Sequence, residues 1–300
     1  MKKQKFSGFT IIELLLVISI IGLLSSIVMV SLKGARESAK LASAKLFSAN
    51  IKHALGAYIL GEWNFDDGNP TIATDSSGNG LNAIIVGYSV DNNSFEKKGI
   101  TTSGGAGPLK YIGGLSVPSG KYDIKSGSIT IESWLKPLTT GNLNFAFASR
   151  HNPSWTVLDW HFGYNSVDKI AGGVTRDIGG MPNVCWLAYN VSDLTGDKVI
   201  AANKWNHVAL TYQALTGELN IYINGKKAGQ TAACGPGNII NSAGFLFSAA
   251  ATYDTNISVD QIRIYDSSLN LSQIQQNYAR GLIKISIEEF TGKKQFVKAY

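Results

Sequence analysis

The chain has 300 residues, of which 16% are charged and 32 are glycine, together with 12 tyrosines, 12 phenylalanines and 6 tryptophans. This composition is typical of short strands joined by glycine-rich turns, and the length suits one large β domain with an additional segment. The formal net charge is +6, but beyond the first few residues the lysines and arginines are scattered among acids. We therefore expect no basic patch and no nucleic-acid partner.

The N-terminus combines a short basic stretch with a long apolar one. Residues 9–32 contain one ionisable side chain, Glu13, and as a helix they would extend about 36 Å, enough to span a bilayer. The apolar run is longer than that of a secretory signal peptide, so we expect it to be retained. Because Lys2, Lys3 and Lys5 precede the span, the positive-inside rule predicts a single pass with a cytoplasmic N-terminus and an exported body.

A second helical pattern follows the span. From Lys33 to Tyr58 the chain has no proline, and small or apolar residues recur at alternate steps of four and three, at Ala35, Ala39, Ala42, Leu46 and Ala49. This spacing predicts an amphipathic helix that continues the span, about 50 residues and 75 Å in total. Such a rod suits packing against the chain's own head or against other copies. The alternative is a spacer helix behind a simple signal-anchor.

The start of the chain resembles the processing and assembly segment of type IV pilins and pseudopilins. The residues that carry the resemblance are Gly8, Phe9, Thr10 and Glu13, which lie between a lysine-bearing leader and a long apolar helix. The resemblance implies a leader over residues 1–8, and a transmembrane and stalk helix over residues 9–60. It also implies that a prepilin peptidase cleaves between Gly8 and Phe9 and methylates the new N-terminus. Loss of the leader removes three lysines and lowers the net charge from +6 to +3.

The same resemblance gives Glu13 a role in assembly. A carboxylate within hydrocarbon costs a few kcal/mol when it is unpaired, and the cationic Phe9 amine of a neighbouring subunit would neutralise it. The alternative is that Glu13 lies in the interface and extends its carboxylate to the headgroups. The chain departs from many pilins in one respect, because no proline occurs between Phe9 and Tyr58.

From Glu62 onward the pattern alternates with a period of two and contains regular turn signals, such as Asn224-Gly225 between two strand-like runs. This predicts an all-β antiparallel jelly-roll sandwich after the long N-terminal α-helix.

Near the end, LNLSQIQQNYARG predicts a short helix with Leu271, Ile274 and Tyr278 on one face and Gly281 as its stop. Residues 282–300 are expected to form a C-terminal strand and tail.

Several of these strand segments carry a second resemblance. They are EWNFDDG (62–68), DSSGNGLNA (75–83), SITIESWLKP (128–137), KWNHVALTY (204–212), LNIYINGK (219–226) and VDQIRIYDSSL (259–269). In order and spacing they resemble the LamG-like jelly roll of the concanavalin A-like lectin and glucanase superfamily, which implies one domain over residues 61–281.

Some members of that superfamily hold a structural Ca²⁺. The resemblance makes Asp66, Asp67, Asp75 and Asp260 candidate ligands, since hard oxygen donors suit calcium. The alternative is that Asp75 begins an ordinary capped turn.

The pattern of acids argues against catalysis. A glycosidase of this superfamily needs two carboxylates that flank the scissile bond, and these usually alternate along one strand. Glu132 stands alone near Trp134, and the adjacent Glu288 and Glu289 would point to opposite faces of a strand. Four histidines without HExxH spacing leave no good zinc site. We therefore predict that the protein is not an enzyme.

Residues 150–165 concentrate aromatic and polar side chains, the combination that sugar sites use. The candidate ligand-binding residues are Arg150, His151, Trp155 and Trp160, although alternating aromatics in a sandwich are more often part of its core.

Cys185 and Cys234 are the two cysteines. On the exported side they are expected to form a disulfide, or else to be two small buried residues.

These features predict a structural subunit of a type IV pilus-like or pseudopilus surface filament, with a lectin-like head for adhesion or filament architecture. One alternative is a type II secretion pseudopilin that binds no glycan, and another is a membrane-tethered carbohydrate-binding protein. The expected partners are other pilin subunits in a homopolymeric or mixed filament, a prepilin peptidase, inner-membrane assembly machinery and a glycan. The protein would lie in the cytoplasmic membrane before assembly and at the cell surface afterwards.

Overall fold

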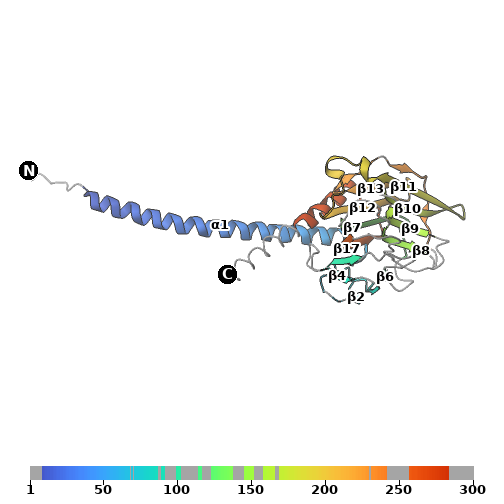
Figure 1. Cartoon of the computed structure of the whole chain (residues 1–300), viewed down its shortest axis with the longest axis horizontal. Coiled ribbons are helices and arrows are strands. Elements are labelled where there is room, and N and C mark those ends of the chain that lie inside the picture. The colour runs from blue at the N-terminus through green and yellow to red at the C-terminus, as the bar shows by residue number, and fades with distance from the viewer. Residues whose placement is uncertain are drawn as a thin grey trace, which may run out of the picture. The chain divides into compact units, whose positions relative to one another are not determined.

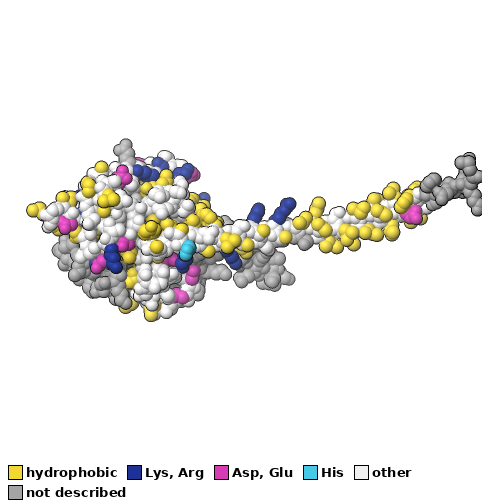
Figure 2. Space-filling model, turned by 180° about the vertical axis from the view of Figure 1, so that it is seen from behind, with side chains coloured by type: hydrophobic (Ala, Val, Ile, Leu, Met, Phe, Trp, Pro, Cys, Tyr) yellow, Lys and Arg dark blue, Asp and Glu magenta, His cyan; other side chains and the backbone are white. Residues whose placement is uncertain are grey.

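The first element is one long helix, α1, which spans Ile11–Gly56. The computed structural model that contains it describes residues 9–67, 69, 71–86, 89–91, 99–102, 114–116, 123–137, 145–151, 158–165, 169–229, 231–241 and 257–283. The segment Ile11–Met29 is long and apolar enough to cross a membrane, and Figure 2 shows hydrophobic side chains gathered along it. The chain divides into two compact units, residues 1–50 and 51–300, and we call the second unit the head.

The continuous helix is confirmed, but it ends earlier than predicted. It stops at Gly56 rather than at residue 60, and strand β1 (Ile59–Trp63) begins before the expected domain start at residue 61. The Tyr58 amide donates to the Leu55 carbonyl at 3.0 Å, which closes the last turn. Ile59 then pairs with Tyr265, so strand pairing overrides the local helical pattern.

The head is built from antiparallel strands in three sheets. After β1 the strands are β2 (Ile72–Ala73), β3 (Ala83–Val86), β4 (Ser89–Asp91), β5 (Gly99–Thr102), β6 (Gly114–Ser116), β7 (Ile129–Pro137), β8 (Phe145–His151), β9 (Leu158–Asn165), β10 (Lys169–Ile178), β11 (Met181–Asn190), β12 (Asn206–Gln213), β13 (Glu218–Ile223), β14 (Lys226–Lys227), β15 (Ala232–Ala233), β16 (Asn238–Ile239) and β17 (Ile257–Tyr265). Within the described residues, a nine-stranded sheet has the order β14-β13-β12-β7-β17-β5-β4, with β1 on β17 and β15 on β13. A five-stranded sheet has the order β11-β10-β9-β8 with β16 on β10, and β2-β3-β6 form the smallest sheet.

The two larger sheets lie face to face, as Figure 1 shows, and the core fills the space between them. On β9 the alternate side chains of Trp160, Phe162 and Tyr164 are buried in this core, and Ile131 and Leu210 come from the opposite sheet. The period-two pattern of the sequence therefore matches the sandwich. The predicted fold, a long N-terminal helix followed by an all-β antiparallel sandwich, is confirmed.

The C-terminal helix covers residues 271–283 and differs from the expectation at Gly281. The helix continues through this glycine instead of stopping there. A Cβ at this position would collide with the Trp134 indole, so the missing side chain lets the helix pack closely on β7. The two residues of the predicted C-terminal strand that are described, 282 and 283, are helical, and residues 284–300 lie outside the described residues.

A buried network of charged side chains lies on the nine-stranded sheet. Its centre is Arg263 of β17, whose Nε lies 2.7 Å from Glu62 Oε1 on β1 and whose Nη1 lies 3.0 Å from Glu132 Oε1 on β7. All three residues are 0% exposed. The third guanidinium nitrogen, Nη2, donates to Gln261 Oε1 at 2.6 Å. Because Gln261 has a φ of 47° beside an irregularity in the β7–β17 register, this strand is distorted where Arg263 enters the network.

Two helical segments complete the network. Lys52, on the last turns of α1, lies 3.2 Å from Glu62 Oε2, and Arg280 of the C-terminal helix lies 3.1 Å from Glu62 Oε1. Asn277 of the same helix donates to Glu132 Oε2 at 3.1 Å. The two buried carboxylates therefore receive cationic or amide partners from one strand, β17, and from two helices.

The balance of these contacts keeps both carboxyl groups ionised. Burial alone would raise the pKa of Glu62, but the nearby Arg263 and Arg280 outweigh it and lower this pKa from 4.5 to about 2. Burial likewise opposes ionisation of Glu132. The His207 imidazole, whose Nε2 lies 3.4 Å from Glu132 Oε2, and the charge of Arg263 lower the pKa of Glu132 to about 2 as well.

Replacing Arg263 with methionine is expected to destabilise the head by about 3 to 5 kcal/mol, because it leaves the buried Glu132 without its guanidinium partner and Glu62 with only Lys52 and Arg280. The decrease in urea unfolding midpoint measures this cost. The matched control is Lys226→Met, which removes one partner of an ion pair with Asp197 whose side chains are 57% and 69% exposed. This control is expected to cost less than about 1 kcal/mol. Equal effects of the two variants would contradict the assigned importance of the network.

The same network predicts a defined acid sensitivity. The folded pKa of about 2 for Glu62 and Glu132 lies below the ordinary 4.5. Their stabilisation is therefore present above pH 4.5 and is lost as the pH falls from 4.5 toward 2. In Arg263→Met both pKa values rise, so acid unfolding, followed by tryptophan fluorescence, should occur at a higher pH than in the wild type. An unchanged acid midpoint in that variant would count against the ion pairing.

Candidate functional site

The residues at the start of α1 form a reciprocal cap. The Thr10 amide and hydroxyl both donate to Glu13 Oε2 at 2.8 Å, and the Glu13 amide donates to Thr10 Oγ1 at 3.3 Å. This is the capping-box arrangement, in which two side chains satisfy free amides at a helix N-terminus. Phe9 is exposed just before the cap, and Gly8 lies outside the described residues. The structure thus adds a role within one chain to the intersubunit role expected for Glu13.

Two of the three serines in the segment Ile11–Met29 donate to the backbone of their own helix. The hydroxyl of Ser19 donates to the Leu15 carbonyl at 2.8 Å, and that of Ser26 donates to the Leu23 carbonyl at 2.7 Å. Such internal bonds are what a helix needs in hydrocarbon, where water is absent. Glu13 therefore remains the group in Ile11–Met29 whose charge needs a partner from outside the segment.

The four candidate calcium ligands have different surroundings. Asp75 accepts hydrogen bonds from the amides of Glu62, Ser77 and Leu81, at 2.9 to 3.0 Å, and from the Ser77 hydroxyl at 2.8 Å. Its carboxylate therefore organises a turn, in line with the alternative interpretation.

Asp66 and Asp67 are exposed, and Asp67 accepts from Asn69 and Thr74. Asp260 is buried in β17 and accepts from the Gln261 amide at 2.6 Å. Among the described residues, no three Asp, Glu, His or Cys side chains form a group that could hold a metal ion. The four aspartates do not fit a calcium site as a set, and calcium binding stays a prediction.

The candidate ligand-binding residues are not brought together on an open surface. Trp160 points into the core, and Arg150 is buried beside Asp159 and Asp123, with nitrogen–oxygen distances of 3.1 and 2.9 Å. Alternation along β9 directs Trp160 inward, and pairing with two acids holds Arg150 in its buried position. The ligand roles expected for both residues stay predictions. His151 ends β8.

Trp155 lies outside the described residues. The ligand roles expected for it and for His151 stay predictions.

A different aromatic pair faces outward on the same sheet. His161 and Trp186 stack with ring centroids 5.4 Å apart and an interplanar angle of 23°. Both residues pair in register with Gly173 on the strand between them. A Cβ on Gly173 would collide with the Trp186 ring, so the glycine lets the indole lie flat across β10. The sequence signal that was overlooked is alternation, since His161 occupies the position next to the inward Trp160.

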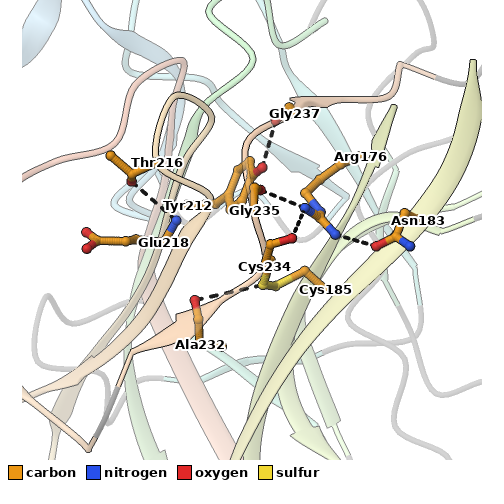
Figure 3. Close-up of a disulfide and its surroundings, with 10 residues drawn as sticks. All are labelled: Arg176, Asn183, Cys185, Tyr212, Thr216, Glu218, Ala232, Cys234, Gly235 and Gly237. Atoms are coloured by element: carbon orange, nitrogen blue, oxygen red, sulfur yellow. Dashed lines mark hydrogen bonds between the residues drawn. A yellow bond between two sulfur atoms is a disulfide. The ribbon is translucent and has the colours of Figure 1, made fainter. Parts of the chain in front are cut away.

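The two cysteines are joined, and Figure 3 shows their surroundings. Cys185 of β11 forms a disulfide with Cys234, with Cα atoms 5.7 Å apart. Beside the bond, Arg176 donates to the carbonyls of Cys234 and Gly235 and to the Asn183 side chain. The disulfide and this guanidinium together tie β11 to the segment that follows β15.

Comparison with known proteins identifies both parts of the chain. Residues 3–29 match the prokaryotic N-terminal methylation motif, and residues 110–275 match the concanavalin A-like lectin/glucanases superfamily. No curated protein matches the chain.

Among solved structures, the binding domain of Paraclostridial Mosquitocidal Protein 1 is similar with a TM-score of 0.56 and 17% identity, over 75% of this chain and 52% of that one. The binding domain of botulinum neurotoxin DC in complex with rat synaptotagmin II gives 0.51 and 17%, over 76% and 52%. A structure of botulinum neurotoxin type C, described as dependent for cell entry on two ganglioside molecules, gives 0.50 and 17%, over 76% and 52%.

The chain spans about half the length of these structures, and at such identity the likeness concerns the β-sandwich fold alone. The match over residues 110–275 covers more than half of the chain. The protein therefore belongs to the concanavalin A-like lectin/glucanases superfamily and carries a prokaryotic N-terminal methylation motif ahead of that domain.

Proposed function

We propose that the protein is a pilin-like subunit that is processed between Gly8 and Phe9, is assembled through its N-terminal helix, and displays a lectin-like head at the cell surface. The observation that carries the proposal is the order of parts: a methylation motif over residues 3–29, an uninterrupted helix to Gly56, and a superfamily domain over residues 110–275. A simple membrane tether would need neither the motif nor the long helix. Adhesion or filament architecture is the role proposed for the head.

The chemistry of the first residues supports assembly. Cleavage before Phe9 would place a cationic amine one residue before the Thr10 cap, at the positive end of the helix dipole, where a negative partner is favoured. In a single chain Glu13 accepts both hydrogen bonds from Thr10 at Oε2, which leaves the charge of the carboxylate uncompensated. The Phe9 amine of a neighbouring subunit would supply the missing positive charge within the hydrocarbon.

The head is proposed to bind rather than to catalyse. Glu62 and Glu132 are carboxylates on adjacent parts of one sheet, but both are fully buried and share Arg263. They cannot flank a substrate bond as glycosidase acids do. Two of the similar structures come from proteins whose descriptions name synaptotagmin II or gangliosides. These two similar structures support a role for this head in binding at a cell surface.

The intact mass of the protein from the sheared surface fraction of its native host tests processing. We expect the mass of Phe9 to Tyr300 plus one methyl group, because cleavage and N-methylation act at the same residue. The membrane fraction of the same cells serves as the control for unassembled protein. A full-length, unmethylated chain confined to membranes would overturn the proposal in favour of a tethered lectin-like domain.

Two substitutions at one position separate capping from charge. Glutamine at the third helical position still accepts from the cap residue, so Glu13→Gln retains the capping box and removes the charge, whereas Glu13→Ala removes both. We expect both variants to be cleaved normally and to decrease about tenfold or more in the sheared fraction, as loss of a few kcal/mol predicts. Immunoblots of sheared and membrane fractions measure the ratio.

Thr10→Val is the matched control for this pair, because it removes the capping hydroxyl and keeps the carboxylate. It should enter the surface fraction almost as well as the wild type. Normal incorporation of Glu13→Gln together with loss of Thr10→Val would mean that capping, and not charge compensation, is what assembly requires.

A further inference from the structure

Arg176 of β10 is a buried cation whose hydrogen-bond partners are all neutral. The residue is 2% exposed. Its Nη1 donates to the carbonyls of Cys234 and Gly235, the second at 2.7 Å, and its Nη2 donates to Asn183 Oδ1. Its Nε is buried and has no hydrogen-bond partner. An arginine is almost never buried to this extent unless an acid pairs with it.

The other buried arginines of the described head have the partner that Arg176 lacks. Arg150, Arg263 and Arg280 are at most 5% exposed, and each has a carboxylate oxygen at 2.7 to 3.1 Å. Within the described residues, Arg176 alone among these four has oxygens of amides and peptide groups in place of a carboxylate. Its charge is therefore an exception within its own fold.

The acids close to Arg176 do not compensate it. Asp177, the next residue of β10, faces the other side of the strand and accepts from the Gly180 amide at 2.7 Å. Figure 3 shows the Glu218 carboxylate pointing away from the guanidinium. Burial raises the pKa of Tyr212, and the positive charge of Arg176 opposes that rise. The positive charge therefore acts on its surroundings without an acid to balance it.

The part of the guanidinium that remains available has the shape of a carboxylate site. Nε and Nη2 form one edge of the planar group, and such an edge can donate to both oxygens of a carboxylate. On this edge Nε has no partner and Nη2 is bound to the Asn183 amide. Asn183 is exposed, so movement of one surface side chain frees Nη2 for a ligand.

The surroundings of this edge are fixed by the fold. Arg176 and Asn183 are paired in register on β10 and β11. The disulfide joins Cys185 to Cys234, whose carbonyl holds Nη1 on the opposite side of the guanidinium (Figure 3). Donors that are held in place in this way lose little conformational entropy when a ligand binds.

We propose that Arg176 and Asn183 form a binding site for a single carboxylate group, which replaces the Asn183 amide on Nη2 and also accepts from Nε. The ligand supplies the negative charge that Arg176 lacks, and burial strengthens such a charge-assisted pair. The carboxylate belongs to a small organic acid or to an acidic side chain of a larger ligand. The site lies within the head, so this inference goes beyond pilin assembly and does not rest on it.

Urea unfolding of the full chain in detergent, followed by tryptophan fluorescence, tests the site with formate as the probe. A ligand that binds the folded state multiplies the folding constant by 1 + [formate]/Kd. We expect a higher urea midpoint for the wild type in formate than in chloride at equal ionic strength. The amide of N-acetylaspartic acid is the second probe. An increase with both probes supports an acidic side chain as the ligand, and an increase with formate alone supports a small acid. No increase with either overturns the proposal.

Asn183→Asp separates ligand binding from a purely structural role of Arg176. It places a carboxylate where the amide now lies, so the pair forms within the chain. We expect its urea midpoint in chloride to exceed that of the wild type, and formate to raise it no further. An unchanged or lower midpoint in chloride would contradict an uncompensated Arg176.

Val184→Asp is the matched control. It adds the same charge one residue along β11, on the opposite face of the strand, where Val184 is 61% exposed. It should respond to formate as the wild type does. A formate response of equal size in Asn183→Asp and the wild type would assign the effect to the solvent and overturn the site. Intact mass reports on processing at Gly8 separately, so failure here leaves the proposed function testable.

Discussion

The head depends on one buried guanidinium that two carboxylates share. Arg263 joins Glu62 and Glu132, which are separated from it by 201 and 131 residues, and all three are fully buried. Buried ion pairs often add little stability relative to an apolar core, but loss of one partner is costly. Any register that separates β1 or β7 from β17 would leave a buried charge without compensation. The network therefore selects one strand arrangement among those that the apolar pattern alone would allow.

The same carboxylates link the sheet to the helical segments around it. Lys52, from the last turns of α1, contacts Glu62, and Asn277 of the C-terminal helix contacts Glu132. Close packing accompanies these contacts, because Gly281 allows the helix to approach Trp134. The outer side of the sheet is consequently buried, and Asn206 through Tyr212 of β12 are buried on both of their faces. The end of α1 is thus part of the folded head, which explains why the boundary between the two units falls inside the helix.

Sequence patterns predicted the helix and the strands, which depend on neighbouring residues, but they did not predict contacts between residues distant in the sequence. The apolar run at residues 9–32 and the alternating strands follow from periodicity, and Thr10 and Glu13 have the spacing of a capping box that the sequence already contained. Glu132 looked isolated because its partners lie far away in sequence. Trp160 was predicted to bind a ligand, but its side chain is buried. The next residue along the strand, His161, points outward and stacks on Trp186. Which face of a strand meets solvent depends on the partner sheet, and periodicity alone does not identify it.

Glu13 meets two separate requirements with one side chain. Its spacing from Thr10 completes the capping box within one chain. Its charge has no positive partner inside Ile11–Met29, because that segment contains no lysine, arginine or histidine. Under the proposed function the segment lies in hydrocarbon, where an unpaired carboxylate is costly. The cap therefore belongs to the fold of the single chain, whereas compensation of the charge would depend on a neighbouring subunit.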